Sequence, residues 1–284
     1  MNRSREPRVF RHLVDEAAFI HKAVFSVWGI RRTHVLQNVG LGANPAIGGP
    51  RRMYARAQHG KNRLTGNPFE LKYGKLRNWE HVAPFRLVVR SEGLPLSGAQ
   101  VRIILGNLFR KGYRCQVSQV ELTFDISQYS LAFLRRQLLS HARSLTALQD
   151  RHKRNTLYVG TVRSPWQLRM YQKTDACVRV EFVLRPAFLR KHSFGSIESL
   201  VGLRKLDIAD MAQFREFREG RLMPILKRTR NFWGKELLLQ SPSRWPLQVL
   251  VSVLRYRGRM NPEIFLRCSS TQHLLYRMLS NLVW

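Results

Sequence analysis

Residues 156–185 read TLYVGTVRSPWQLRMYQKTDACVRVEFVLR and decide the fold, because they predict three consecutive β-strands. TLYVGTV is rich in β-branched and aromatic residues, which favour strands, and Ser164-Pro165 ends it. WQLRMYQK and VRVEFVLR each alternate apolar and polar residues, which is the period of a half-buried strand. Residues 174–176 between them form a connection short enough for a hairpin.

The alternation gathers polar side chains on one face of the predicted sheet. These are Gln167, Arg169, Tyr171, Lys173, Arg179, Glu181 and Arg185. A tyrosine, several basic groups and a carboxylate together are suited to cutting a phosphodiester bond. An ordinary solvated sheet face carries similar residues, and the alternation by itself favours that interpretation.

Charge sets the second constraint. The 284 residues include 49 Lys and Arg against 18 Asp and Glu, for a formal net charge of +31, while 44% of the residues are hydrophobic. This composition predicts a globular chain that attracts polyanions. Nucleic acid is the expected partner, since phosphate contacts dominate such binding. An anionic membrane surface is the rival, but no separate amphipathic basic helix supports it.

The cysteines and the apolar stretches indicate which cellular compartment to expect. Cys115, Cys177 and Cys268 are far apart and odd in number, which fits neither a disulfide framework nor a zinc site. We therefore expect a reducing cytoplasm. No apolar stretch follows the basic start of the chain, so no signal peptide is expected. The longest apolar run, near PLQVLVSVL, is too short to span a bilayer.

Residues 1–68 are interpreted as a basic N-terminal segment. Asp15 to Ile30 has apolar residues at near-helical spacing and predicts an amphipathic helix. Gly40 to Arg52, GLGANPAIGGPRR, predicts a flexible loop. This loop either lies on DNA through Arg51 and Arg52 or is a disordered tail, and the sequence supports both equally.

Residues 69–195 are interpreted as an α+β domain. The elements expected before the three strands are strands at 69–75 and 84–92, a helix at 96–112 capped by Ser97, a strand at 115–127 and a helix at 130–145. This order predicts an antiparallel sheet with helices packed on one face and the polar face open to a ligand.

Residues 196–284 are predicted to form a mainly helical C-terminal region, with the boundary near Phe194–Ser196. Its segments NFWGKE, at 231–236, and LRYRGR, at 254–259, interleave aromatic and basic residues. Such residues suit base stacking and phosphate contact, here by Arg255 and Arg257. They suit a buried junction between helices equally well.

The few carboxylates suggest a metal site. Glu121 and Asp125 share one face of the strand at 115–127, but four strand residues span roughly 13 Å. Glu181 from another strand could join one of them, and two carboxylates with waters suit Mg²⁺ or Mn²⁺. Alternatively, Glu121 and Glu181 simply pair with Arg179 or Arg169 across the sheet.

Tyr171 is the candidate nucleophile. A tyrosine can attack phosphorus, but its ordinary pKa is about 10, so it needs nearby positive charge. Arg169 and Lys173 flank it on the same side of the strand and could stabilise a phenolate or clamp a phosphate. Tyr158 has no such flanks and is interpreted as a packing residue.

The stretch TLYVGTVRSPWQLRMYQK, followed by VRVEFVLR, resembles the trans-acting replication initiators of rolling-circle plasmids and related phage initiation factors. Those proteins show a Thr-Ile/Leu-Tyr-Ile/Val-Gly-Ser run, then Arg-x-Tyr-x-Lys, then a strand with a glutamate. An upstream acidic strand is matched here by QVELTFD. The resemblance covers roughly residues 69–190 in the same order. Thr161 replaces the family's serine, and Gln119 replaces a basic residue.

The resemblance implies that a tyrosine nicks one DNA strand, forms a covalent 5′-phosphotyrosine link and frees a 3′-OH that primes synthesis. Carried over, Tyr171 is the nucleophile, and Arg169 and Lys173 contact phosphate. The metal ligands for Mg²⁺ or Mn²⁺ would be Glu121, Asp125 and Glu181. Further DNA contacts are expected from Arg51, Arg52, Arg163, Arg179, Arg255 and Arg257. Origin DNA, a host helicase and polymerase, and a second copy of the chain are the expected partners.

Two other enzyme classes fit less well, and one non-enzymatic class stays open. No His-hydrophobe-His pair occurs, which disfavours the other large class of tyrosine nicking enzymes. His273 and Tyr276 hint at a tyrosine recombinase, but their spacing on an apolar helix favours packing. The alternative function is a non-enzymatic, basic nucleic-acid-binding protein on a similar sheet.

Overall fold

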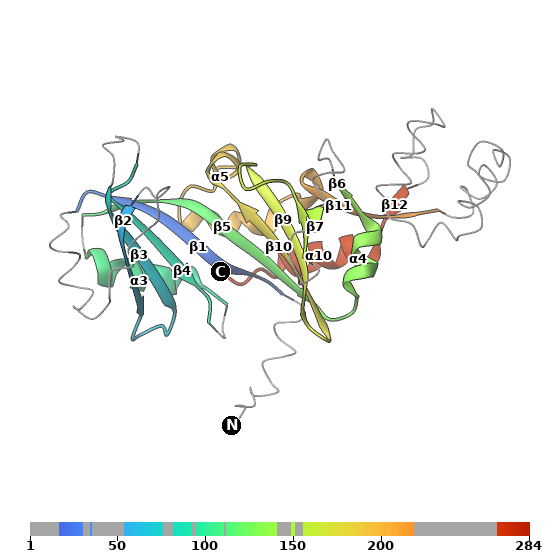
Figure 1. Cartoon of the computed structure of the whole chain (residues 1–284), viewed down its shortest axis with the longest axis horizontal. Helices are drawn as coiled ribbons and strands as arrows, with labels where there is room; N and C mark the ends of the chain where they lie inside the picture. The colour runs from blue at the N-terminus through green and yellow to red at the C-terminus, as the bar shows by residue number, and fades with distance from the viewer. Residues whose placement is uncertain are drawn as a thin grey trace, which may run out of the picture.

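The computed structural model describes residues 17–30, 35, 54–75, 82–92, 95–110, 112–140, 149–150, 156–218 and 266–284. Within them the fold is α+β, as the sequence predicts. A large antiparallel sheet has the strand order β2-β3-β4-β1-β5-β10-β9-β8-β7 (Figure 1). Its strands are β1 (Ala18–Trp28), β2 (Tyr54–Lys61), β3 (Pro68–Lys75), β4 (Phe85–Arg90), β5 (Arg114–Ile126), β7 (Gln149–Asp150), β8 (Leu157–Val159), β9 (Trp166–Thr174) and β10 (Cys177–Leu184).

One face of this sheet is apolar and carries the helices. The inward residues of β10, predicted from the alternation, are fully buried: Val178, Val180, Phe182 and Leu184. The helices of the described chain are α3 (Gly98–Phe109), α4 (Leu131–Gln137), α5 (Pro186–Lys191) and α10 (Ser270–Ser280), with the 3-10 helices η2 (Glu198–Lys205) and η3 (Ile208–Asp210). Their apolar residues form one core with the sheet. The opposite face is thereby left to the polar side chains.

The predicted strands around the central hairpin are confirmed. β9 and β10 pair antiparallel with Tyr171 opposite Arg179, and β10 pairs with β5 with Arg179 opposite Asp125. The predicted Ser97 cap is present as a capping box, in which the Ser97 hydroxyl and the Gln100 side chain each bond the other's backbone N–H. These local signals place β5, β9 and β10 side by side.

The helix predicted between Asp15 and Ile30 is wrong, because Ala18–Trp28 is strand β1. β1 lies in the middle of the sheet between β4 and β5, where both of its faces are covered. Phe19 and Ile20, neighbours on opposite faces, are both buried. A strand buried on both faces does not alternate apolar and polar residues. The spacing of its apolar residues therefore resembled that of an amphipathic helix.

Three further helix predictions need correction. The helix predicted at 130–145 ends at Gln137 and continues as strand β6 (Leu138–Ser140). Within the predicted C-terminal helices, Ala212–Phe217 is strand β11 and Leu266–Cys268 is strand β12. The three strands form a second small sheet in the order β12-β11-β6. β6 and β12, with three residues each, are too short to show a period.

The C-terminal end of the chain packs against the first strand. The Val283 N–H donates to the Ala18 carbonyl, and the Trp284 indole donates to the Ile197 carbonyl. Leu275, Met278 and other α10 residues belong to the main core. The described parts of 1–68 and 196–284 therefore share one core with 69–195. The loop predicted at Gly40–Arg52 and the segments at 231–236 and 254–259 lie outside the described residues.

In the part of the chain that the structure describes, no helix combines the length and the apolar character needed to cross a membrane.

Gly160, just before the turn that leads into β9, should resist substitution. Its φ is +81°, and an added Cβ would lie 3.0 Å from the Trp166 carbonyl oxygen. We expect Gly160→Ala to destabilise the fold by about 1–2 kcal/mol, the cost of a left-handed L-residue. Gly106, inside α3 with nothing within 4 Å of an added Cβ, is the matched control. Gly106→Ala should stabilise by about 0.5–1 kcal/mol in urea unfolding, and equal signs for both would contradict this.

Candidate active site

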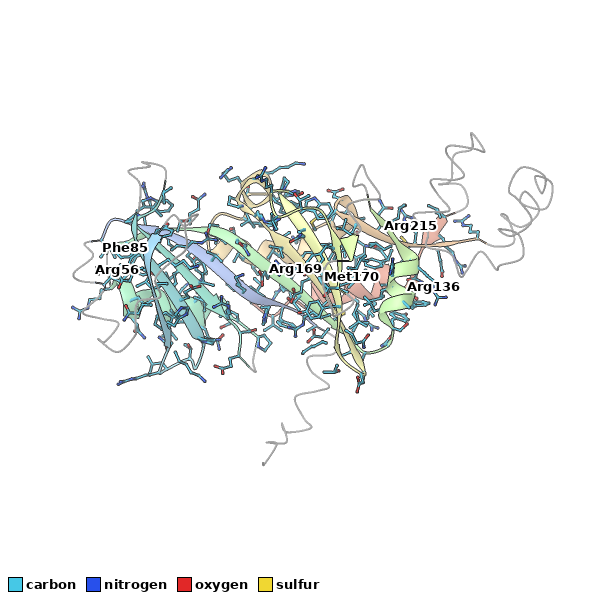
Figure 2. All side chains as sticks on the ribbon, in the orientation of Figure 1. Arg56, Phe85, Arg136, Arg169, Met170 and Arg215 are labelled. Carbon is cyan, nitrogen blue, oxygen red and sulfur yellow. The ribbon has the colours of Figure 1, made fainter. Side chains whose placement is uncertain are left out.

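The polar faces of β9, β10 and β5 form the site. Arg169 and Met170 are neighbours on β9 that belong to opposite faces, Met170 being fully buried in the core (Figure 2). On the polar face, Tyr171 lies between Arg169 and Lys173, and β10 contributes Arg179 and Glu181. The face is far from open, since Glu121, Asp125, Arg179 and Glu181 are all buried. The longer side chains of β9 lie over these groups.

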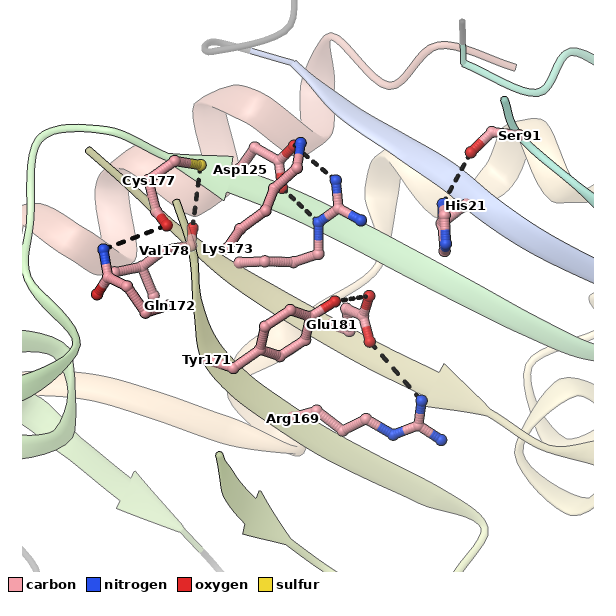
Figure 3. A network of polar contacts seen from close by, with 11 residues as sticks. His21, Ser91, Asp125, Arg169, Tyr171, Gln172, Lys173, Cys177, Val178 and Glu181 are labelled. Atoms are coloured by element: carbon pink, nitrogen blue, oxygen red, sulfur yellow. Dashed lines mark hydrogen bonds and ion pairs between the residues drawn. The ribbon is translucent and has the colours of Figure 1, made fainter. Parts of the chain in front are cut away.

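Tyr171 and Glu181 make the central contact. The Tyr171 hydroxyl donates a hydrogen bond of 2.9 Å to Glu181 Oε1 (Figure 3). The two residues come from adjacent strands and are offset by two residues, since Tyr171 pairs with Arg179 and Glu181 pairs with Arg169. A tyrosine hydroxyl thus points at a buried carboxylate within the distance required for proton transfer.

Glu121 joins this pair through one shared cation, Arg169. Its Oε1 accepts from Lys22 Nζ at 2.8 Å and from Gln119 Nε2 at 3.2 Å. Arg169 Nη1 lies 3.8 Å from Glu121 and 3.7 Å from Glu181 Oε2, so one guanidinium contacts both carboxylates. The sequence left open whether Glu121 and Glu181 converge or pair with arginine, and the structure has both features.

Asp125 is engaged separately. Arg179 Nε and Nη2 donate to its two oxygens at 2.6 and 2.8 Å, and Lys173 Nζ donates at 2.7 Å (Figure 3). The three carboxylates therefore form two groups, with Glu121 and Glu181 on one cation and Asp125 on two others.

The pKa shifts follow from this packing. Burial, and then the neighbouring charge of Glu181, raises the pKa of Tyr171 well above its usual range. Burial, and also the charge of Glu121, raises the pKa of Glu181 despite the hydrogen bond from Tyr171. Arg169 and Lys173 each contact a carboxylate, which partly neutralises the positive charge that they could offer a phenolate. The arrangement favours a neutral tyrosine beside a carboxylate of raised basicity.

Two of the three predicted metal ligands, Glu121 and Glu181, are placed where they could share a metal ion. Among the described residues, no group of three or more His, Cys, Asp and Glu is arranged to hold a metal ion. Glu121 and Glu181 nevertheless converge on one cationic nitrogen of Arg169, and two carboxylates with waters suit Mg²⁺ or Mn²⁺. Thr123 lies opposite Glu181, and its buried hydroxyl has no hydrogen-bond partner among the described residues. This donor set fits a hard cation, whereas Asp125 does not fit.

The predicted DNA contacts fall in different places. Arg163 is exposed in the turn before β9, whereas Arg179 is buried against Asp125. Arg185 ties this turn to the site, donating to the Ser164 carbonyl at 2.8 Å and to Gln167 Oε1 at 3.2 Å. Arg51, Arg52, Arg255 and Arg257 lie outside the described residues.

Three residues near the site were missed or undervalued by sequence reasoning. Lys22 on β1 supplies the positive charge beside Glu121 that Gln119 lacks. His21 bonds Ser91 Oγ at 2.8 Å, and burial, then Arg179, lowers its pKa. Tyr158 was interpreted as packing, yet it pairs with Arg169 and is only partly buried. A strand prediction for β1 would have drawn attention to Lys22, which lies opposite Glu121.

A scan against models of protein families finds no match to this chain, and a search of curated proteins finds none. The site must therefore be judged from its own geometry and from the motif that the sequence carries.

Tyr276, the tyrosine that hints at a recombinase, has a structural role. Its hydroxyl donates to the Asp207 carboxylate at the start of η3 and accepts from the Ala209 N–H. Tyr276 packs against the main core, and the His273 backbone N–H donates to the Ser269 carbonyl within α10. Packing is thus the interpretation that the contacts support.

This contact predicts an alkaline transition. Burial, and then the hydrogen bond to Asp207, raises the pKa of Tyr276 from 10.0 to about 12. The unfolded chain ionises this tyrosine first, so its contribution to stability is complete below pH 10 and is lost as the pH rises towards 12. The stability difference between wild type and Tyr276→Phe should therefore shrink from pH 8 to pH 11 in urea unfolding. A constant difference would contradict the assignment.

Proposed function

We propose that this chain is a rolling-circle replication initiator that nicks and rejoins one DNA strand through a covalent 5′-phosphotyrosine intermediate. The observation that carries the proposal is the hydrogen bond from Tyr171 to buried Glu181, with Arg169, Lys173 and Arg179 around it. The ordered motifs of the sequence and the net charge of +31 support the same reading.

The proposed chemistry is an ester exchange. The Tyr171 oxygen attacks the phosphorus and forms a new P–O bond, while its proton passes to Glu181 Oε1. The bond from phosphorus to the 3′-oxygen breaks, and that oxygen leaves and takes up a proton as a free 3′-OH. Because one phosphate ester replaces another, the step is reversible, which allows rejoining. General base catalysis of this kind contributes about 10²–10⁴-fold.

The cations bind and orient the phosphate. Arg169 is partly exposed over Glu121 and Glu181, and the Lys173 side chain keeps 40% of its surface exposed. Both can donate to phosphate oxygens and stabilise the charge that develops during attack. Glu121 and Glu181 would hold Mg²⁺ or Mn²⁺, which when bound supplies Lewis-acid polarisation of the phosphate.

The proposal extends to partners and location. Origin DNA, in single-stranded or supercoiled form, is the substrate class, and a helicase and a polymerase of the host would act on the freed 3′-OH. A cytoplasmic site of action and a homodimer belong to the same proposal, and three free cysteines agree with a reducing compartment.

A covalent-adduct assay tests the function. The full chain is mixed with a pool of single-stranded oligonucleotides of random sequence, in Mg²⁺ or Mn²⁺, and denatured. We expect a protein band that carries a label placed at the 3′ end of the DNA and not one placed at the 5′ end. A band with the 5′ label would reverse the polarity of the link, and no band with either label or on supercoiled DNA would contradict the nicking function.

A non-enzymatic nucleic-acid-binding protein is the second candidate. One observation favours it, because Glu121, Asp125 and Glu181 each contact at least one cationic side chain. Sites of this kind can serve stability alone. Tight binding that weakens steeply with salt, without any covalent product, would support this candidate.

A further inference from the structure

Asp125 is the most buried carboxylate of the site, with 1% of its surface exposed. Its two oxygens accept three hydrogen bonds, two from Arg179 and one from Lys173, at 2.6 to 2.8 Å. A carboxylate has about four lone-pair positions, so little capacity remains for a metal ion. Burial works to raise the pKa of Asp125, but the hydrogen bonds and charges of Arg179 and Lys173 outweigh it and lower that pKa.

We propose that Asp125 is a positioning residue, and not a metal ligand: it holds Lys173 and Arg179 in place as a phosphate-binding pair beside Tyr171. The identity of the phosphate as one of a DNA strand rests on the proposed function.

Strand register puts the pair at the nucleophile. Arg179 is the cross-strand partner of Asp125 on one side and of Tyr171 on the other. Lys173 follows Tyr171 by two residues on the same face of β9, a separation of roughly 7 Å. The Arg179 guanidinium also lies over the Phe19 ring, 5.5 Å from its centroid. Asp125 and Phe19 together fix the position of this cation.

Both cations keep N–H donors that Asp125 does not use. A guanidinium has five N–H donors, and Arg179 uses one on Nε and one on Nη2 for Asp125. An ammonium has three, and Lys173 uses one for Asp125. The Lys173 side chain keeps 40% of its surface exposed, so an incoming phosphate can reach it.

Asp125→Asn distinguishes the two explanations, because positioning and simple electrostatic attraction predict opposite changes in the affinity for a polyanion. Asp125→Asn adds one net positive charge, so attraction alone predicts tighter binding of a polyanion. Positioning predicts weaker binding, because two like charges then repel each other and a long lysine side chain must be ordered at binding.

The binding experiment uses the full chain and a fluorescent single-stranded oligonucleotide of about six nucleotides, within the range bound by one module. It is run in EDTA and moderate salt, so neither metal nor cleavage contributes. We expect about tenfold weaker binding for Asp125→Asn. Glu70→Gln, the same charge change on strand β3 of the same sheet, should bind as wild type does or more tightly. Asp125→Asn binding as tightly as wild type, or no binding by wild type, would overturn the proposal.

A double-mutant cycle guards against misfolding. Lys173 is half-exposed, so Lys173→Gln should fold normally and also weaken binding. In the Lys173→Gln background, Asp125→Asn should weaken binding clearly less than it does in the wild-type protein, because part of its effect depends on Lys173. Fully additive effects of the two substitutions would overturn the proposal. Mn²⁺ binding, measured by electron paramagnetic resonance, provides a second test. Loss of Mn²⁺ binding in Asp125→Asn together with retained Mn²⁺ binding in Glu121→Gln would also overturn the proposal. Since no arm depends on cleavage, a failure of the nicking function is seen separately.

Discussion

Tyr171→Phe should abolish the covalent adduct, with a loss of at least about a thousandfold, because no other group replaces a missing nucleophile. The phenyl ring keeps the packing of β9, while the hydrogen bond from the hydroxyl to Glu181 is lost. Stability should therefore change by about 1 kcal/mol. The measurement is the rate of adduct formation on denaturing gels, with binding of the same oligonucleotide followed in parallel.

Tyr158→Phe is the matched control. Tyr158 lies opposite Arg169 on β8, the strand that pairs with β9. The control should form the adduct at the wild-type rate. An adduct that survives in Tyr171→Phe and disappears in Tyr158→Phe would move the nucleophile by one strand.

Glu181→Gln should slow adduct formation by about 10²–10⁴-fold, the range of general base catalysis, and also weaken the dependence on Mg²⁺ or Mn²⁺. The amide still accepts the hydrogen bond from Tyr171, and Glu181 is a buried carboxylate whose pKa is raised by burial. Removing that charge should leave stability within about 1 kcal/mol of wild type. Rapid-quench kinetics and urea unfolding provide the two readouts.

Glu70→Gln controls for the loss of a negative charge. Glu70 lies on β3, in the same sheet, and also contacts cations such as Lys72 at 3.2 Å. It should form the adduct at the wild-type rate. Equal losses in Glu70→Gln and Glu181→Gln would assign the effect to overall charge and not to a base at Tyr171.

Much of the fold was predictable where strands have one wet face. The alternation in WQLRMYQK and VRVEFVLR predicted β9 and β10 and placed Tyr171, Arg179 and Glu181 on one face. β1 was not predictable in this way, since both of its faces are covered and its pattern has no period of two. Short strands such as β11 also escaped detection, because their pairing with β6 and β12 is long-range.

The sequence predicted which residues form the site, but not which cation contacts which carboxylate. The sequence named Glu121, Asp125 and Glu181 as one possible set, but alternation cannot tell which cation each carboxylate meets. Register decides this, since it places Arg179 between Asp125 and Tyr171. Lys22 comes from a strand almost 100 residues away in the chain, with a register irregularity beside it, so no local pattern points to it.

The most direct test of the proposed chemistry identifies the residue that carries the DNA. The adduct formed with a 3′-labelled oligonucleotide is digested with nuclease and trypsin, and the modified peptide is sequenced by mass spectrometry. We predict a 5′-phosphonucleotide on Tyr171, in the peptide that spans residues 170–173. A nucleotide on any other residue, Tyr158 included, or a chain that binds the oligonucleotide without ever becoming linked to it, would contradict the central claim.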